Sequence, residues 1–143
     1  MAIKQLSIFV ENKAGKIVEV TELLAKNSID LRALSIADTQ DYGIMRTIVD
    51  DMDKAKKILE ENGSVYKVTE VIGVEIPDVP GGMSKVLSIL SENGINIEYL
   101  YAFISRSKEY AYVVMRVRDN AKAEKILTDN GVNLVDENEI ENI

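Results

Sequence analysis

Two stretches of this sequence end an apolar run in a glycine-containing bend: SIFVENKAGK at residues 7–16 and VEIPDVPGG at residues 74–82. A helix that begins at Gly15 or Gly81 exposes unpaired backbone N–H groups and the positive end of its dipole. Because glycine has no side chain, a carboxylate can approach these N–H groups closely. Both bends therefore predict binding of a small molecule that carries a carboxylate.

A polar side chain stands a few residues before each glycine, Asn12 in the first stretch and Asp78 in the second. Asn12 can hydrogen-bond a polar group of a ligand, and Asp78 can accept a hydrogen bond from an ammonium. An α-amino acid carries a carboxylate and an ammonium on adjacent atoms, so the bends favour amino-acid recognition. A second interpretation stays open, because a glycine at a helix start with Pro80 before it is also ordinary structural punctuation.

The chain contains no His, Cys or Trp. The commonest general base, the thiolate nucleophile and the commonest transition-metal ligands are therefore missing. We expect no catalytic residues, no metal site and no cofactor. An enzyme on the same scaffold remains an alternative, and it would need a Lys/carboxylate site such as Lys16 with Asp30.

The charge balance limits the possible partners. Lys and Arg number 17 against 24 Asp and Glu, which gives a net charge of −7. Nucleic acids and anionic membranes require dense basic surfaces, so we expect neither as a partner. No stretch approaches the ~18 apolar residues of a membrane helix. The start MAIKQLSIFVENK lacks the layout of a signal peptide, and without cysteine the expected compartment is the cytoplasm.

The sequence is an internal repeat. Residues 72–106 align with residues 6–40 at an offset of 66, and the offset becomes 68 after an insertion near Lys108. DDMDKAKKILEENG and RDNAKAEKILTDNG then match along one predicted helix and its ending. Repetition this dense predicts two copies of one fold, with modules at residues 1–70 and 71–143.

Each copy reads as strand, helix, strand, strand, helix, strand. In the first copy the strands are IKQLSIFV, LRALSIAD, YGIMRTIV and VYKVTEVI, with a hairpin turn at residues 39–41. Asp51 or Asp53 can cap the second helix and Gly63 can end it. The order βαββαβ predicts an α+β fold of two ferredoxin-like modules in tandem, each an antiparallel sheet with its helices on one face. VTEVIGVEI, at residues 68–76, contains no spacer, so we expect the last strand of copy one to lead directly into copy two.

These features resemble the ACT domain family, through residues 9–31 and 74–100. The resemblance implies tandem ACT modules whose ligand lies where the bend of one module faces the second-strand start of a neighbour. The implied binding residues are Asn12, Ala14, Gly15, Asp30, Leu31, Asp78, Pro80, Gly81, Asn96 and Ile97. Two positions depart from the liganded pattern: Ala14 replaces the usual Pro, and Asp30 stands where copy two keeps Asn96. A carboxylate at Asp30 repels a ligand carboxylate, which predicts one weakened class of site.

The second copy also carries alternating aromatic residues. Leu100 and Val113 match Leu34 and Met45, which we expect to face the helices, so the aromatics should lie on the opposite face of the sheet. They are Tyr99, Tyr101, Phe103, Tyr110 and Tyr112. RNA stacking, ligand contact and packing against another sheet are the alternatives. The acidic balance disfavours RNA, and we expect a homodimer or higher homo-oligomer formed through this face.

The expected function is therefore a cytoplasmic, non-catalytic regulatory protein that binds an amino acid or a related ligand and acts on a separate enzyme or transcriptional partner. The alternative is a structural or oligomerisation module without a ligand, in which the glycine bends are only turns. The acidic tail DENEIENI, residues 136–143, is expected to be a solvated end and not a cation site.

The pairing of Asn12 with Asn96 is the chemically best matched of the loop and strand-start combinations. We expect the variants Asn12→Ala and Asn96→Ala to lose amino-acid binding measured by calorimetry, because each removes a neutral hydrogen-bonding side chain from the expected site. Binding that is unchanged in both variants would show that this pair is not part of the site.

Overall fold

The computed structural model describes residues 2–38 and 41–143, so part of the expected hairpin turn at residues 39–41 lies outside the described residues. The chain divides into two compact units. Lys4–Thr69 form the first, here named the N-terminal module, and Glu70–Ile143, with the chain's start up to Ile3, form the second, the C-terminal module. Each module is described by itself.

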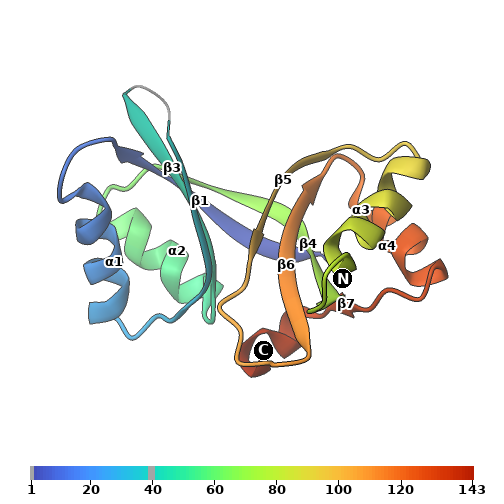
Figure 1. Cartoon of the computed structure of the whole chain (residues 1–143). Helices are drawn as coiled ribbons and strands as arrows, with labels where there is room; N and C mark the ends of the chain where they lie inside the picture. The colour runs from blue at the N-terminus through green and yellow to red at the C-terminus, as the bar shows by residue number, and fades with distance from the viewer. Residues whose placement is uncertain (1, 39–40) are drawn as a thin grey trace. The chain divides into compact units, whose positions relative to one another are not determined.

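The N-terminal module is an antiparallel sheet covered by two helices on one side (Figure 1). Its strand order is β2–β3–β1, with Ile8 opposite Met45 and Ile36 also opposite Met45 in the two strand pairs. The elements are β1 (Ile3–Glu11), α1 (Lys16–Lys26), β2 (Leu31–Asp38), β3 (Tyr42–Val49), α2 (Met52–Glu61) and the first residues of β4 (Tyr66–Pro77).

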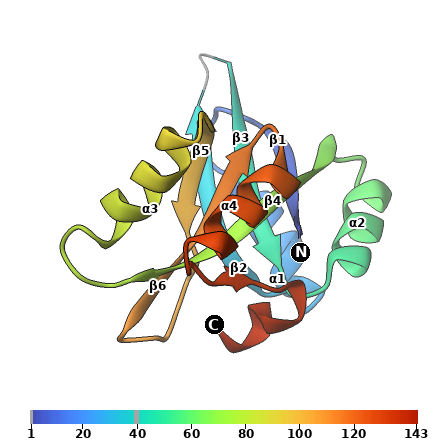
Figure 2. The same cartoon turned by 90° about the vertical axis from the view of Figure 1, so that its right-hand side faces the viewer.

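The C-terminal module repeats this plan, with both helices on the same side of its strands (Figure 2). The remainder of β4 pairs with β6, and β6 pairs with β5, all antiparallel. The last strand of the repeat is short and pairs with the other edge of β4. The further elements are α3 (Gly82–Glu92), β5 (Ile97–Ala102), β6 (Tyr110–Val117), α4 (Asn120–Asp129), β7 (Leu134–Val135) and the 3₁₀ helix η1 (Glu137–Asn142).

The two cores use matching positions of the repeat. Leu24 of α1 and Leu59 of α2 are fully buried against the strands of the N-terminal module. Leu90 of α3 and Leu127 of α4 take the same places in the C-terminal module. Apolar residues alternate along the strands and recur at helical spacing on one face of each helix. Both patterns place the apolar side chains in a single hydrophobic core between the sheet and the helices of each module. The predicted ferredoxin-like βαββαβ plan is confirmed in both modules.

β4 is a single strand of 12 residues that leads from the closing strand of the first copy into the opening strand of the second. The sequence predicted this direct connection from the absence of a spacer. Its burial follows the change of role along the strand: Tyr66–Thr69 are half-buried or exposed, whereas Val71–Val74 are buried.

The aromatic face differs from the expectation in one respect. Leu100 pairs with the core residue Met115, and Tyr101 pairs with Val114, so the aromatics do lie on the face opposite the helices. Tyr101 and Phe103, however, are only 8% and 6% exposed within the single chain. These two side chains therefore expose less surface than the sequence predicted, and oligomerisation through the face stays a prediction.

The C-terminal tail is not the solvated end that its acidic composition predicted. Asp136 caps η1 through a capping box with Glu139, and Ile140 is buried, at 4% exposure. η1 lines a hollow together with Tyr112 and Glu75, on the sheet face opposite the helices. The Tyr112 hydroxyl donates to Glu75 Oε2 at 3.2 Å, and desolvation, followed by the Glu75 charge, raises the pKa of Tyr112. The tail folds back because Ile140 has apolar surface to bury.

Gly82 is required by packing. A Cβ at this position would sit well inside van der Waals contact of the Pro77 carbonyl oxygen, which is backbone and cannot turn aside. We expect Gly82→Ala to lower the free energy of unfolding in urea by about 3 kcal/mol. The matched control is Lys16→Ala at the equivalent position of the N-terminal module, with an expected change within about 0.5 kcal/mol. Equal effects would contradict this packing argument.

Candidate functional site

The first helix of each module begins without a side-chain cap. The N-cap residues are Gly15 before α1 and Gly81 before α3, at φ values of 87° and 86°. Because glycine has no side chain, neither residue can cap its helix with a side-chain hydrogen bond. This left-handed conformation is costly for residues with a Cβ, which explains the glycines. The second helices are different, because Asp51 and Asp119 accept from the N–H of Lys54 and Lys122 at 3.1 and 3.0 Å.

Both bends are open at their glycines. A Cβ placed at Gly15 or Gly81 meets no atom within 4 Å. The neighbouring residues Asn12, Ala14 and Pro80 are exposed. The first N–H of each helix is already bonded within the bend, from Lys16 to the Lys13 carbonyl and from Gly82 to the Val79 carbonyl. The next N–H groups of the first turn have no partner within the helix, and their use by a ligand stays a prediction.

A pocket of about 490 Å³ lies beside the start of α3. Pro80, Gly81 and Lys85 line it on one side, and Tyr110 lies at the start of β6. The turn at residues 130–133, after α4, closes its other side. Asp78 does not line this pocket; its N–H donates to the Glu109 carbonyl at 3.0 Å. The ammonium of Lys85 adds a cation beside the helix start, which favours an anionic group there.

The equivalent pocket of the N-terminal module is smaller, and the charged side chains that line it are different. It measures about 350 Å³ and is lined by Lys16, Glu19 and Tyr42 among others, while Asn12, Ala14 and Gly15 lie outside its lining. Glu19 stands at the repeat position of Lys85, and its carboxylate lies 3.6 Å from the Lys16 ammonium. The cation of this pocket is thus already matched by a carboxylate, whereas no ion pair of Lys85 occurs within residues 2–38 and 41–143.

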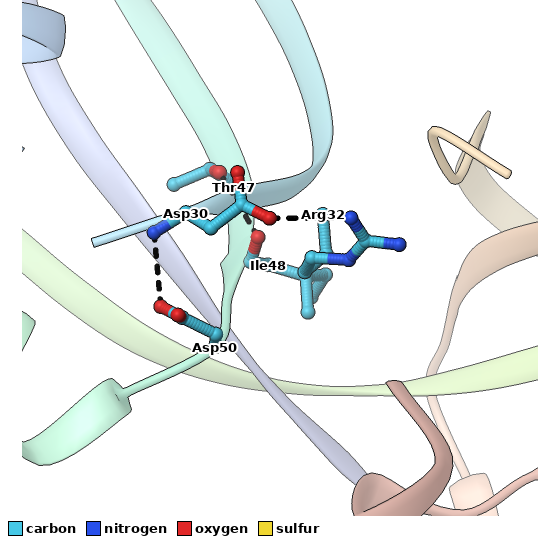
Figure 3. A network of polar contacts seen from close by, with 5 residues as sticks. All are labelled: Asp30, Arg32, Thr47, Ile48 and Asp50. Carbon is cyan, nitrogen blue, oxygen red and sulfur yellow. Dashed lines mark hydrogen bonds and ion pairs between the residues drawn. The ribbon is translucent and has the colours of Figure 1, made fainter. Parts of the chain in front are cut away.

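The start of β2 in the N-terminal module is occupied by the chain's own polar groups (Figure 3). The Asp30 N–H donates to Asp50 Oδ1 at 3.0 Å, and Arg32 Nη1 lies 3.2 Å from Asp30 Oδ2. Thr47, on the adjacent strand, donates to the Ala33 carbonyl at 2.8 Å. Asp30 is therefore a member of a polar network that ties the second strand to the end of the third.

The start of β5 has a different arrangement: Glu98, at the repeat position of Arg32, lies 3.5 Å from Arg116 Nε of the adjacent strand. Asn96 lines a cleft of about 510 Å³, together with Arg118 and Lys122. Arg118 stands at the repeat position of Asp50, and a guanidinium has only donors, so it cannot accept from the Asn96 N–H. Leu31 and Ile97, the other two strand-start residues, pack against the cores of their modules. They have only backbone groups to offer a ligand.

The ten predicted site residues thus lie at four places: the bend before α1, the bend before α3, the start of β2 and the start of β5. Within the C-terminal module Pro80 and Gly81 share one pocket, and Asn96 lines a different one. Three functional candidates were missed by sequence reasoning: Lys85, Arg118 and Lys122. The repeat contained a signal for two of them, because Lys85 aligns with Glu19 and Arg118 aligns with Asp50. A reversal of charge between the two copies indicates a position where the copies differ.

No cluster of three or more His, Cys, Asp or Glu suited to a metal ion occurs within residues 2–38 and 41–143. In that same part of the chain, every helix is too short or too polar to cross a membrane.

The sequence matches the family model of the ACT domain pair over residues 1–143. The chain belongs to this ACT domain family. The ACT domain pair is a regulatory module, and the tandem ferredoxin-like fold described above is that of the family. A comparison with curated protein sequences found no match.

Solved structures of several proteins are similar to this ACT domain pair. A protein from Bacteroides thetaiotaomicron is 43% identical, with a TM-score of 0.93 over 100% of this chain and 98% of that one. The regulatory subunit of aspartate kinase from Thermus thermophilus is 18% identical, with a TM-score of 0.63 over 88% and 89% of the two chains. Aspartate kinase from Synechocystis is 22% identical, with a TM-score of 0.56 over 89% of this chain and 25% of that chain. The latter two support the fold alone.

The network at Asp30 predicts a difference between the modules. Asp50→Ala removes the acceptor of the Asp30 N–H, so we expect the free energy of unfolding to fall by about 1 kcal/mol. Arg118→Ala, at the repeat position in the C-terminal module, should change it by less than about 0.5 kcal/mol. Urea titrations of both variants measure this. A loss at Arg118 as large as the loss at Asp50 would mean that Arg118 has a structural role.

Proposed function

We propose that this ACT domain pair is a non-catalytic protein that binds an amino acid or a closely related small molecule and regulates a separate enzyme or transcriptional partner. One observation carries the proposal. In both modules the first helix starts at a left-handed glycine without a cap, while the second helix of the same module is capped by an aspartate. The first N–H of α1 or α3 donates to a backbone carbonyl of its bend. The absence of a capping side chain leaves the following N–H groups of the first turn for another acceptor, and this difference between the two helices recurs in both modules.

The chemistry of the bends fits an α-amino acid. The N–H groups and dipole at the start of α1 or α3 suit its carboxylate. Asn12 or Asp78 supplies an oxygen for its ammonium, and Pro80 and Gly81 form the wall of a pocket large enough for a free amino acid. The strand-start residues Asn96 and Asp30 remain part of the proposed set, although Asp30 is engaged with Arg32 and Asp50.

The proposed regulation is a coupling free energy. A ligand that binds one conformation of the pair more tightly than another shifts the population towards that conformation and changes a surface that a partner reads. The structurally similar Thermus thermophilus protein is a regulatory subunit of aspartate kinase, and its likeness to this chain is one of fold. Action on a separate polypeptide is part of the proposal. The enzyme alternative has little support, because the Lys16 ammonium it would need lies beside Glu19.

A purely structural role is the second candidate, and exposed apolar side chains favour it. Phe9, Tyr42 and Val65 of the N-terminal module are 46%, 57% and 66% exposed, and all three line the same hollow. Tyr99, Tyr110 and Tyr112 remain partly exposed on the aromatic face. Surfaces of this kind are often covered by a second copy, so we propose that the protein forms a homodimer or higher homo-oligomer in either case.

Thermal-shift measurements with each proteinogenic amino acid separate the two functions. A ligand that binds only the folded state at 100 times its Kd should raise the melting temperature of this protein by about 5–10 °C. We expect Lys85→Glu, which copies Glu19 of the other module, to remove most of this shift. Lys67→Glu on the exposed side of β4 makes the same charge change away from the pocket and should keep it. If no amino acid raises the melting temperature, the structural role is favoured.

A further inference from the structure

The cleft at the start of β5 differs from every other hollow described above in its supply of donors. It is formed by the turn after α3, the end of β6 and the first turn of α4, and it measures about 510 Å³. Its lining residues are Gly94, Ile95, Asn96, Glu98, Arg118, Asp119 and Lys122. The cleft shares none of these residues with the pocket beside Gly81.

The two carboxylates of the cleft, Glu98 and Asp119, contact groups other than the side chains of Arg118 and Lys122. Glu98 Oε2 lies 3.5 Å from Arg116 Nε, and Asp119 Oδ1 accepts from the Lys122 backbone N–H at 3.0 Å. Both acids therefore have another role, one in an ion pair and one as a helix cap. Within residues 2–38 and 41–143, neither the Arg118 guanidinium nor the Lys122 ammonium forms an ion pair, so their charges are available to a ligand.

Comparison with the N-terminal module shows what has changed. Asp30, Arg32 and Asp50 stand where the cleft has Asn96, Glu98 and Arg118. In the N-terminal module the carboxylate of Asp50 satisfies the Asp30 N–H, and Asp30 in turn holds Arg32 (Figure 3). Asp30 and Asp50 are replaced by a neutral amide and a guanidinium, whereas Arg32 is replaced by the carboxylate of Glu98, which pairs with Arg116. A guanidinium has only donors, so the acceptor that bonds to the strand-start N–H in the N-terminal module is missing at the position of Arg118.

From this reversal we propose that the cleft binds an acidic group, a carboxylate or a phosphate, and that the ligand of this protein is therefore an acidic amino acid or a similar organic acid. The planar guanidinium of Arg118 can hold two oxygens of such a group, and Lys122 and the Asn96 amide add further donors. The inference rests on the proposed function, since Asn96 lines the cleft and also belongs to the proposed set of ligand-binding residues, and it adds the charge of the ligand. The opposing interpretation is that Arg118 and Lys122 are ordinary solvated surface charges.

Calorimetry on the full chain at constant ionic strength tests the proposal with matched pairs. L-aspartate is compared with L-asparagine, and L-glutamate with L-glutamine, which differ in side-chain charge at nearly constant size. We expect the acid of one pair to bind at least about tenfold more tightly than its amide. Inorganic phosphate is titrated separately by amide NMR, to ask whether the backbone signals of Asn96, Arg118 and Lys122 shift in a saturable way.

Arg118→Asp restores the residue type of the other module and should remove both the preference for the acid and the phosphate-induced shifts. Arg106→Asp makes the same charge change on an exposed loop of the same module and serves as the control. Arg118→Lys keeps the positive charge but loses the planar guanidinium that can hold two oxygens, so we expect the preference for the acid over its amide to be partly retained. Melting curves establish that each variant is folded.

The outcomes separate this inference from the proposed function. If amino acids bind but acids have no advantage over their amides, or Arg118→Asp acts no differently from Arg106→Asp, the inference is wrong and the function stands. If no amino acid binds while phosphate shifts the cleft signals in the wild type and not in Arg118→Asp, the cleft is supported and the proposed function fails. If neither class of ligand binds, Arg118 and Lys122 are solvated charges and the inference is overturned.

Discussion

The constraint on which this molecule depends is the left-handed backbone at the start of the first helix in each module. Gly15 and Gly81 turn the chain sharply enough for α1 and α3 to lie back on the strands that precede them. A residue with a Cβ resists this conformation by about 1–2 kcal/mol, so the turn and the absence of a capping side chain come together. The buried leucines Leu24 and Leu90 hold the two helices down, and the bare N–H groups are the cost of that geometry.

Duplication then allowed the two copies to differ where the core does not constrain them. Leu59 and Leu127 are interchangeable because each fills the same space between helix and sheet. The polar corners are not interchangeable. Asp50 accepts a hydrogen bond from the strand-start N–H in one module, whereas Arg118, at its repeat position, cannot accept one. Glu19 forms an ion pair with Lys16. Lys85 stands at the repeat position of Glu19, and the position equivalent to Lys16 is Gly82. The polar groups of the N-terminal module thus contact one another, whereas Lys85 and Arg118 form no ion pair within the part of the chain that the structure describes.

The fold was predictable from the sequence because repetition and periodicity report on packing, which both copies share. Asp51 was also foreseen as a cap, since a carboxylate before a helical run has one obvious use. The tail was misjudged, because Ile140 and Ile143 are hidden among acidic residues and only the tertiary structure offers them a surface. The site was predicted in part: the glycine bends are visible in sequence, but the unpaired state of Arg118 depends on where Glu98 and Asp119 direct their oxygens. The assignment of ligand-binding residues remains a prediction.

An acidic ligand for a protein of net charge −7 needs a physical account. The net charge is spread over the whole surface, and at physiological salt the field of each exposed charge is screened within about 8 Å. An acidic group bound as proposed would lie at hydrogen-bond distance from Arg118 and Lys122, whereas the carboxylates of the cleft, Glu98 and Asp119, contact Arg116 Nε and the Lys122 backbone N–H. Local donors therefore outweigh the global charge once the ligand is seated, while the surrounding acids slow its approach and reject large polyanions such as nucleic acids. A small acid that fits the cleft is attracted by these nearby donors and is only weakly repelled by the net negative charge of the protein.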